Sequence, residues 1–264
     1  MEVVRPEFVP DPSLSRGEME QLQRDIADAA DFSDDFGFDP TSVGAGTGGD
    51  SAQTRLGERG DGEPPLVAGV DQAFDGDDAV SAVVVSRGGE VVERVSAVEP
   101  TEIPYIPGLL SFREGGAILS ALAKLDSDPD VLVVDGSGRI HFREAGLATH
   151  IGVTVDCPAL GVAKNLLCGR PRESLESPLP EGRRVPIEAD RDVTAPDGTV
   201  IGYAFQSRQY DSPNQHINPL YVSPGHRVSA ETAVDIVERC CGGYKLPEPT
   251  RLADSYADDV KRAR

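Results

Sequence analysis

The sequence contains no tryptophan, only two methionines and four cysteines, and no apolar run long enough to cross a membrane. The cysteines form no CxxC pair, which argues against a zinc site. The first residues lack the basic start and apolar centre of a secretory signal, so a disulfide framework is not expected either. We therefore expect a cytoplasmic protein with no membrane partner, and we assign the cysteines no chemistry.

Lysine is scarce as well, because only four of the 25 basic residues are lysines, against 45 acidic residues and a net charge of -20. Proteins that bind phosphate groups of nucleic acid normally carry a basic surface, and this net charge argues against one. In molar salt, however, the Debye length shrinks to about 3 Å and the repulsion among carboxylates is screened. We interpret the charge as the adaptation of a halophile, and expect any contact with nucleic acid to be local.

The chain divides by composition into four parts. Apolar residues at helical spacing between positions 14 and 30 predict an N-terminal helical segment over residues 1–30. Residues 31–65 are rich in Gly, Asp, Ser and Pro, and we interpret them as an acidic, flexible insert. A main domain is expected over residues 66–253, followed by a C-terminal tail at 254–264.

In the first part of the main domain, apolar residues recur at every second position, as in strands. After that, helical and strand patterns alternate. Three strands joined by tight turns should form an antiparallel meander, followed by helices and further strands on a mixed sheet. The strands are expected at 67–74, 79–87, 90–98, 131–134, 159–163, 193–207 and 219–222, and the helices at 112–125, 144–153 and 229–241. This α/β pattern, a mixed β-sheet flanked by helices, resembles the ribonuclease H-like fold.

Two carboxylates each end a short apolar run: Asp71 follows residues 67–70, and Asp135 follows residues 131–134. A charge at the end of a buried strand is costly, although a single Asp there often only opens a turn. Two of them, with Glu114 in a helix and His226 after a later strand, favour a metal site. Hard oxygen ligands suit Mg²⁺ or Mn²⁺ better than zinc, so metal-assisted phosphodiester cleavage is the candidate chemistry.

Six segments occur in an order that resembles the endonuclease V family, the deoxyinosine-directed repair nucleases. They are residues 67–71, 104–114, 135–141, 161–167, 222–229 and 246–253. The resemblance implies that Asp71, Glu114, Asp135 and His226 are catalytic, and that the first three hold Mg²⁺, for which Mn²⁺ can substitute. Whether Glu114 binds the metal directly or through water stays open, as does whether His226 orients a water or a second metal.

Tyr105 lies in a loop bracketed by prolines, which gives its ring a stiff support. The resemblance implies that Tyr105, with Ile106 and Pro107, wedges into the base stack when a nucleotide is extruded. The alternative is a tyrosine that anchors the loop to the core.

Glycines after Asp135 would let the backbone approach a base closely. The resemblance implies a base pocket that also includes Gly108, Leu110 and His141 beside Gly136 and Gly138, and a phosphate contact from Lys164.

These expectations combine into one function. The protein should recognise a deaminated purine in DNA containing deoxyinosine, flip it out, and hydrolyse a phosphodiester bond with Mg²⁺. The position of the cut, at the second phosphodiester on the 3′ side, is implied by the resemblance alone. An inosine-specific endoribonuclease on single-stranded RNA is the nearest alternative. A non-cleaving protein that binds damaged nucleic acid is a further one.

Overall fold

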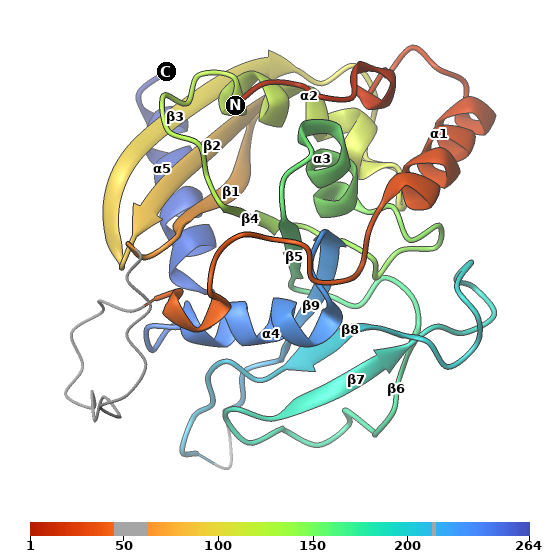
Figure 1. Ribbon diagram of the computed structural model, residues 1–264, viewed down its shortest axis with the longest axis vertical. Helices are drawn as coiled ribbons and strands as arrows, with labels where there is room; N and C mark the ends of the chain where they lie inside the picture. Colours follow the sequence, from red (N-terminus) through yellow and green to blue (C-terminus); the bar gives the residue numbers. More distant parts are fainter. Residues whose placement is uncertain (45–62, 213–214) are drawn as a thin grey trace.

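A nine-stranded mixed sheet forms the centre of the computed structural model, which describes residues 1–44, 63–212 and 215–264 (Figure 1). Its strand order is β3-β2-β1-β4-β5-β9-β8-β7-β6. The strands are β1 (Leu66–Asp75), β2 (Asp78–Arg87), β3 (Glu90–Pro100), β4 (Val131–Asp135), β5 (Ala159–Ala163), β6 (Arg170–Pro171), β7 (Arg184–Glu188), β8 (Val200–Phe205) and β9 (Leu220–His226). The predicted α/β fold with a mixed sheet is confirmed.

The first five strands have the expected ribonuclease H-like arrangement. β1, β2 and β3 form an antiparallel meander, and β4 and β5 then add to β1 in parallel. Valine and alanine dominate β1, β2 and β4, and their side chains are buried on both faces, as is typical of strands covered by helices on either side. The local sequence pattern was therefore sufficient to predict this half of the sheet.

The second half of the sheet differs from the prediction. The expected strand at 193–207 is shortened to β8, and β6 and β7 lie in a stretch where no strand was expected. Pro186 sits in the middle of β7, where it pairs with Tyr203. Its missing N–H is tolerated because β6, the neighbour on the other side, is only two residues long. Because proline is rare inside strands, the sequence pattern did not predict β7, although its Val185 and Ile187 are fully buried.

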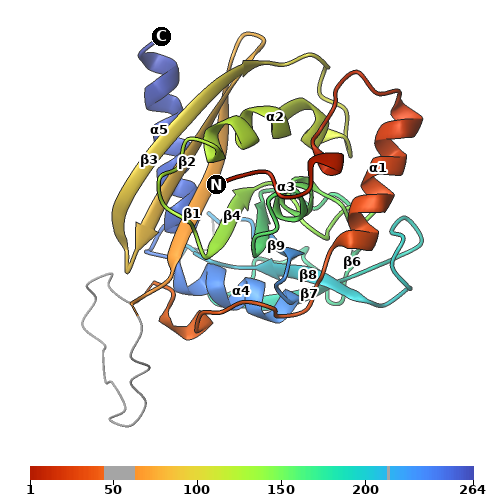
Figure 2. The same cartoon turned by 45° about the horizontal axis from the view of Figure 1, so that its top comes forward.

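Helices cover both faces of the sheet. They are α1 (Arg16–Ala29), α2 (Leu110–Leu122), α3 (Leu147–Val155), α4 (Ala230–Arg239) and α5 (Glu248–Arg262). α2 and α3 pack on one face, with α1 outside α3, and α4 and α5 lie on the other (Figure 2). Ser229 caps the start of α4, since its side chain accepts a hydrogen bond from the Thr232 N–H at 3.2 Å. Among the described helices none is long and apolar enough to cross a membrane.

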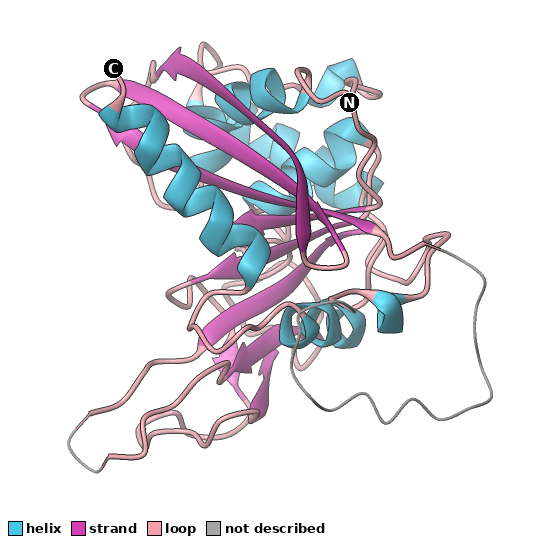
Figure 3. Ribbon diagram, turned by 90° about the vertical axis from the view of Figure 1, so that its left-hand side faces the viewer, coloured by secondary structure: helices cyan, strands magenta, loops and turns pink. Residues whose placement is uncertain are grey.

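α5 runs through the residues that we expected to be a tail. It lies along the sheet next to β1 and β2 (Figure 3). Its buried face is made of small residues, Thr250, Ala253 and Ala257, so the sequence shows no strong apolar stripe there. The approach is close: a Cβ atom on Gly69 would lie 1.9 Å from the Pro249 carbonyl oxygen, so β1 admits only glycine at this position.

The predicted flexible insert at 31–65 lies partly outside the described residues, which end at 44 and resume at 63. Its first part is attached to the body of the protein. The Phe36 and Phe38 rings stack at 4.5 Å and pack against the core beneath α4, and Val43 is buried there. Asp34 also accepts a hydrogen bond from the Ser229 N–H at 2.6 Å.

Candidate active site

The two strand carboxylates lie side by side. β1 and β4 are parallel and pair Val70 with Val134, so Asp71 and Asp135 occupy the next level on neighbouring strands. Both point to the face covered by α4 and α5, as do the alternate residues Val67 and Val133. Burial, and then the charge of Asp135, raises the pKa of Asp71 far above its ordinary value. The pair therefore demands either a proton or a cation.

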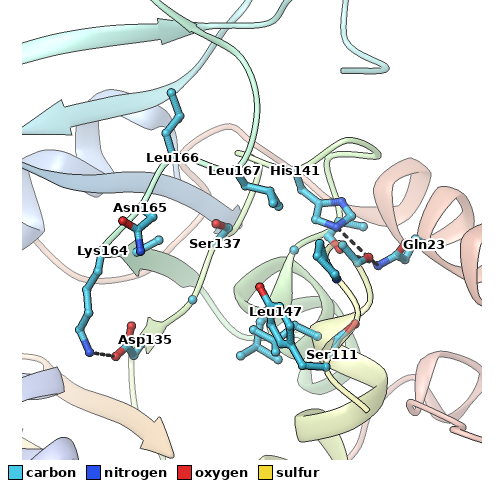
Figure 4. A pocket seen from close by; sticks show the side chains of 18 residues that line it. Gln23, Ser111, Asp135, Ser137, His141, Leu147, Lys164, Asn165, Leu166 and Leu167 are labelled. Carbon is cyan, nitrogen blue, oxygen red and sulfur yellow. Dashed lines mark hydrogen bonds and ion pairs between the residues drawn. The ribbon is translucent and has the colours of Figure 1, made fainter. Parts of the chain in front are cut away.

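Lys164 supplies a positive charge to this pair. It follows β5, and its Nζ donates to Asp135 Oδ2 at 2.9 Å (Figure 4). Burial opposes the charged form, but Asp135 and then Asp71 keep the pKa of Lys164 above its ordinary value. The ammonium group thus occupies the position beside Asp135 that a cation would take.

Glu114 lies near the start of α2 and is 7% exposed. The pKa of its carboxyl is raised to about 7, mainly by burial; Arg113 opposes the rise, and Asp135 adds to it. A carboxyl with its pKa near neutrality, close enough to Asp135 to be affected by its charge, is a candidate for proton transfer or for metal binding.

Asp254 is a site residue that the sequence analysis missed, because the main domain was ended at Ala253. Its carboxyl is close enough to that of Asp71 to add to the rise in the pKa of Asp71. It also acts on the ammonium group of Lys164. The only signal in the sequence is its spacing: Asp254 follows Thr250 by four residues and so lies beside the buried stripe of Thr250, Ala253 and Ala257, although its own side chain is exposed.

The structure does not bring His226 to these carboxylates, contrary to the expectation that it completes the catalytic set. His226 pairs with Ala159 at the start of β5, whereas Asp135 pairs with Val162, three residues or roughly 10 Å further along the strand. The buried imidazole accepts the Asp31 N–H at Nδ1 and donates Nε2–H to Asp156, each at 3.2 Å. These bonds give His226 a role in attaching residues 31–44 to the body.

The predicted metal ligands do not form a closed cage. Among the described residues, no three His, Cys, Asp or Glu side chains gather closely enough to hold one ion. Mg²⁺ does not require such a cage, since it is usually bound by one or two carboxylates and keeps several waters or substrate phosphate oxygens. Asp71 and Asp135, with the Lys164 ammonium standing in for a cation, fit that donor set.

A cavity of about 460 Å³ opens beside Asp135 (Figure 4). Its walls come from α1, the loop before α2, the segment after β4 and the segment after β5. The lining residues are Gln23, Tyr105, Pro107, Gly108, Leu110, Ser111, Asp135, Gly136, Ser137, His141, Ala145, Gly146, Leu147, Ala163, Lys164, Asn165, Leu166 and Leu167. Seven of the nine predicted substrate-binding residues are among them.

Ile106 and Gly138 are the two that do not line the cavity. Ile106 packs in a small apolar cluster with Met19 and Phe112. Gly138 lies against β9, where a Cβ atom would come within 2.2 Å of the Pro224 carbonyl oxygen. Both positions therefore support the walls and do not face the space inside. Tyr105, by contrast, lines the cavity and is 60% exposed, so it is not anchored in the core.

One wall is fixed by a hydrogen-bond network centred on Gly108. Its φ of +79° favours glycine, and its carbonyl accepts from Gln23 Nε2 at 2.8 Å and His141 Nε2 at 3.0 Å. His141 Nδ1 accepts the Arg143 N–H, which leaves the hydrogen on Nε2. Burial lowers the pKa of His141 to about 4, so the ring is neutral. The contribution of Gln23, from a helix 85 residues away in sequence, was not predicted.

Comparison with known proteins agrees with this geometry. A model of the family described as Endonuclease V matches residues 51–255. An endonuclease V of Haloarcula marismortui is 70% identical over 262 residues, which cover 98% of this chain and 97% of that protein. The crystal structure of the Bacillus subtilis endonuclease V superposes with a TM-score of 0.76 at 25% identity, covering 99% of this chain and 98% of that one. A Ciona intestinalis endonuclease V, in complex with DNA containing an inosine followed by a ribo-adenosine, has a TM-score of 0.68 at 24% identity, covering 94% and 98%.

Proposed function

Because this chain belongs to the endonuclease V family, we propose that it is an endonuclease that recognises deoxyinosine in DNA and hydrolyses the second phosphodiester bond on the 3′ side of the lesion. The haloarchaeal relative confirms the halophilic origin predicted from the acidic composition. The observation that carries the proposal is the juxtaposition of Asp71 and Asp135 with the neighbouring cavity.

Asp71 and Asp135 are the residues that would hold a divalent metal, Mg²⁺ or Mn²⁺ in its place. When bound, such an ion polarises the scissile phosphate and lowers the pKa of the attacking water. Glu114, whose pKa lies near 7, is placed to accept a proton from that water or to orient it. The Gln72 N–H donates to Asp71 Oδ1 at 2.7 Å and would hold that carboxylate in one orientation, and Asp254 adds negative charge next to it.

The cavity suits an extruded base. Its volume of about 460 Å³ lies in the range of small-molecule sites, roughly 300–1,000 Å³. Its histidine is neutral, so hypoxanthine, with O6 as acceptor and N1–H as donor, would be read by neutral groups. Ser111 lines the cavity, and its buried hydroxyl has no hydrogen-bond partner in the described part of the chain, which makes it a candidate to pair with a base.

Two other residues that line the cavity would contact the strand: Tyr105 would fill the gap left in the stack when the base leaves, and Lys164 would contact the backbone phosphate as a point charge. Transfer of Lys164 from Asp135 to a phosphate would leave Asp135 available to a metal. When substrate binds, the Lys164–Asp135 ion pair would therefore be replaced by a contact between Asp135 and the metal.

The direct test is cleavage of a labelled duplex with a single deoxyinosine in the presence of Mg²⁺, across a series of salt concentrations. We expect one nick, mapped on a sequencing gel to the second bond 3′ of the lesion, and none on the matched guanine duplex. Asp135→Ala should abolish the nick while the protein remains folded. Absence of cleavage by the wild type from low to molar salt would overturn the proposal, as would full cleavage by Asp135→Ala.

Inosine-containing RNA is the alternative substrate, and the ribo-adenosine after the inosine in the Ciona complex motivates its test. One oligonucleotide sequence carrying either inosine in RNA or deoxyinosine in DNA would be cleaved in parallel. Faster cleavage of the RNA would replace the DNA-repair assignment by an endoribonuclease. Tight binding of either substrate without cleavage, in spite of the gathered carboxylates, would favour the non-cleaving binder.

A further inference from the structure

A second lysine, Lys245, lies at the same edge of the sheet as the carboxylates. β5 pairs Ala163 with Tyr221, and β8 pairs Phe205 with Leu220, so Lys164 and Ser207 leave the sheet at the same edge. The Ser207 hydroxyl donates to the Lys245 carbonyl oxygen at 2.5 Å. Lys245 is thereby tied to the edge where β4 ends at Asp135.

The charge environment of Lys245 is unusual for this chain. The sequence has 45 acidic residues, yet none of those described forms an ion pair with Lys245. The side chain is half-buried, and burial and then the ammonium group of Lys164 lower the pKa of Lys245. A partly desolvated cation placed near another cation is unfavourable unless an anion binds between or beside them.

Lys124 and Lys261 also form no ion pair among the described residues, but their side chains are exposed, whereas that of Lys245 is half-buried. Lys124 donates to the Ser96 carbonyl oxygen on the far side of the meander, and Lys261 is exposed in the last turn of α5, where a cation stabilises the helix dipole. Most basic residues of this chain are arginines, yet two of its four lysines, Lys164 and Lys245, lie at the edge of the sheet where β4 ends. This placement points to a need for compact, mobile positive charges there.

We propose that Lys245 binds a backbone phosphate of the substrate strand next to the scissile one, with Lys164 on the scissile side. The inference rests on the proposed function, because the anion is a phosphodiester of the nucleic acid. Lys245 would be a positioning residue: it would hold the strand in register over Asp71 and Asp135 without touching the reacting atoms. In a chain of this net charge, it would form part of the local cationic surface that nucleic acid requires.

The test is binding of a fluorescent deoxyinosine oligonucleotide, without added metal so that no cleavage occurs, to the wild type and to Lys245→Met. Met keeps the apolar stem and removes the charge. We expect about a tenfold weaker affinity and a salt slope reduced by about one. The loss should be equal on the matched guanine oligonucleotide, because a phosphate contact carries no base information.

Lys245→Arg keeps the charge and should bind more tightly than Lys245→Met, whereas Lys124→Met and Lys261→Met should bind like the wild type. Thermal unfolding of each variant checks that the fold is kept. The inference is overturned if Lys245→Met has the wild-type affinity and salt slope, or if Lys261→Met loses as much affinity. If the wild type fails to cut deoxyinosine at all, the proposed function fails; if it cuts and Lys245→Met binds normally, only this inference fails.

Discussion

Lys164 Nζ lies 2.9 Å from Asp135 Oδ2, so the cation beside this carboxylate in the metal-free protein is the protein's own lysine. Asp71, one strand away, forms no ion pair within the described residues: burial and the charge of Asp135 raise its pKa, and Asp254 adds a third carboxyl. The site therefore holds more negative charge than its lysine neutralises. Removing one of these negative charges should therefore raise the stability of the fold and lower the cleavage activity.

Asp71→Asn should stabilise the metal-free fold and abolish cleavage. Because the pKa of Asp71 is raised in the folded state, the stability it contributes is full at low pH and is lost as the pH rises. At neutral pH the neutral amide avoids that loss, and each kcal/mol gained raises the melting temperature by about 2–4 °C. Thermal unfolding in EDTA measures it, with the exposed Asp126→Asn as control. A lower melting temperature for Asp71→Asn would contradict the buried-charge account.

Glu114 should give the metal-free protein a pH-dependent stability. Its pKa rises from 4.5 in the unfolded chain to about 7 in the folded one, so stability decreases between these two values and then levels off. Glu114→Gln should flatten this part of the profile in denaturant titrations at several pH values. Cleavage should increase as the pH passes about 7, because the carboxylate is the active form. A cleavage rate that is constant from pH 5.5 to 8 would argue against this role.

Gln23→Ala should weaken the cavity wall from a distance. It removes the Nε2 hydrogen bond to Gly108 and leaves the carbonyl and Arg143 Nη1 each short of a buried partner, at a cost of about 1–3 kcal/mol. We expect a higher KM for deoxyinosine substrate with a smaller change in kcat. Gln21→Ala, on the exposed side of the same helix, is the matched control. If the two variants have the same KM and kcat, α1 does not contribute to substrate recognition.

His226→Ala should destabilise the fold and spare the chemistry. The substitution leaves the Asp31 N–H and Asp156 without their buried partner, which costs about 1–3 kcal/mol. Measured where the variant is fully folded, kcat should equal that of the wild type, as it should for the exposed His216→Ala. A large loss of kcat with unchanged stability would return His226 to the catalytic set.

Tyr105→Ala should lower activity through the ring and not the hydroxyl. Stacking of one base on an aromatic ring contributes about 1–3 kcal/mol, so binding of deoxyinosine duplex should weaken by an order of magnitude or more, whereas Tyr105→Phe should bind normally. Tyr210, another exposed tyrosine, provides the control. A Tyr105→Phe variant as impaired as Tyr105→Ala would show that the hydroxyl is the important group.

The strands that carry Asp71 and Asp135 were predicted because their apolar runs are local, and the side-by-side register then follows from parallel pairing. Gln23 and Asp254 escaped prediction for a different reason: each reaches the site from a helix whose packing depends on distant contacts. His226 shows the converse. A histidine next to a recognisable motif suggested catalysis, but a bulge and an antiparallel strand place it at the opposite end of β5.

The register of β1 and β4 also makes the spacing of the catalytic carboxylates independent of the charge on the protein surface. Neighbouring strands are held about 4.8 Å apart by main-chain hydrogen bonds, so the spacing of the two carboxylates is set by the backbone and not by the residues around it. Surface residues are then free to change in number and sign without disturbing that spacing. A lineage entering brine can exchange its lysines for aspartates across the exterior and keep the same reaction centre.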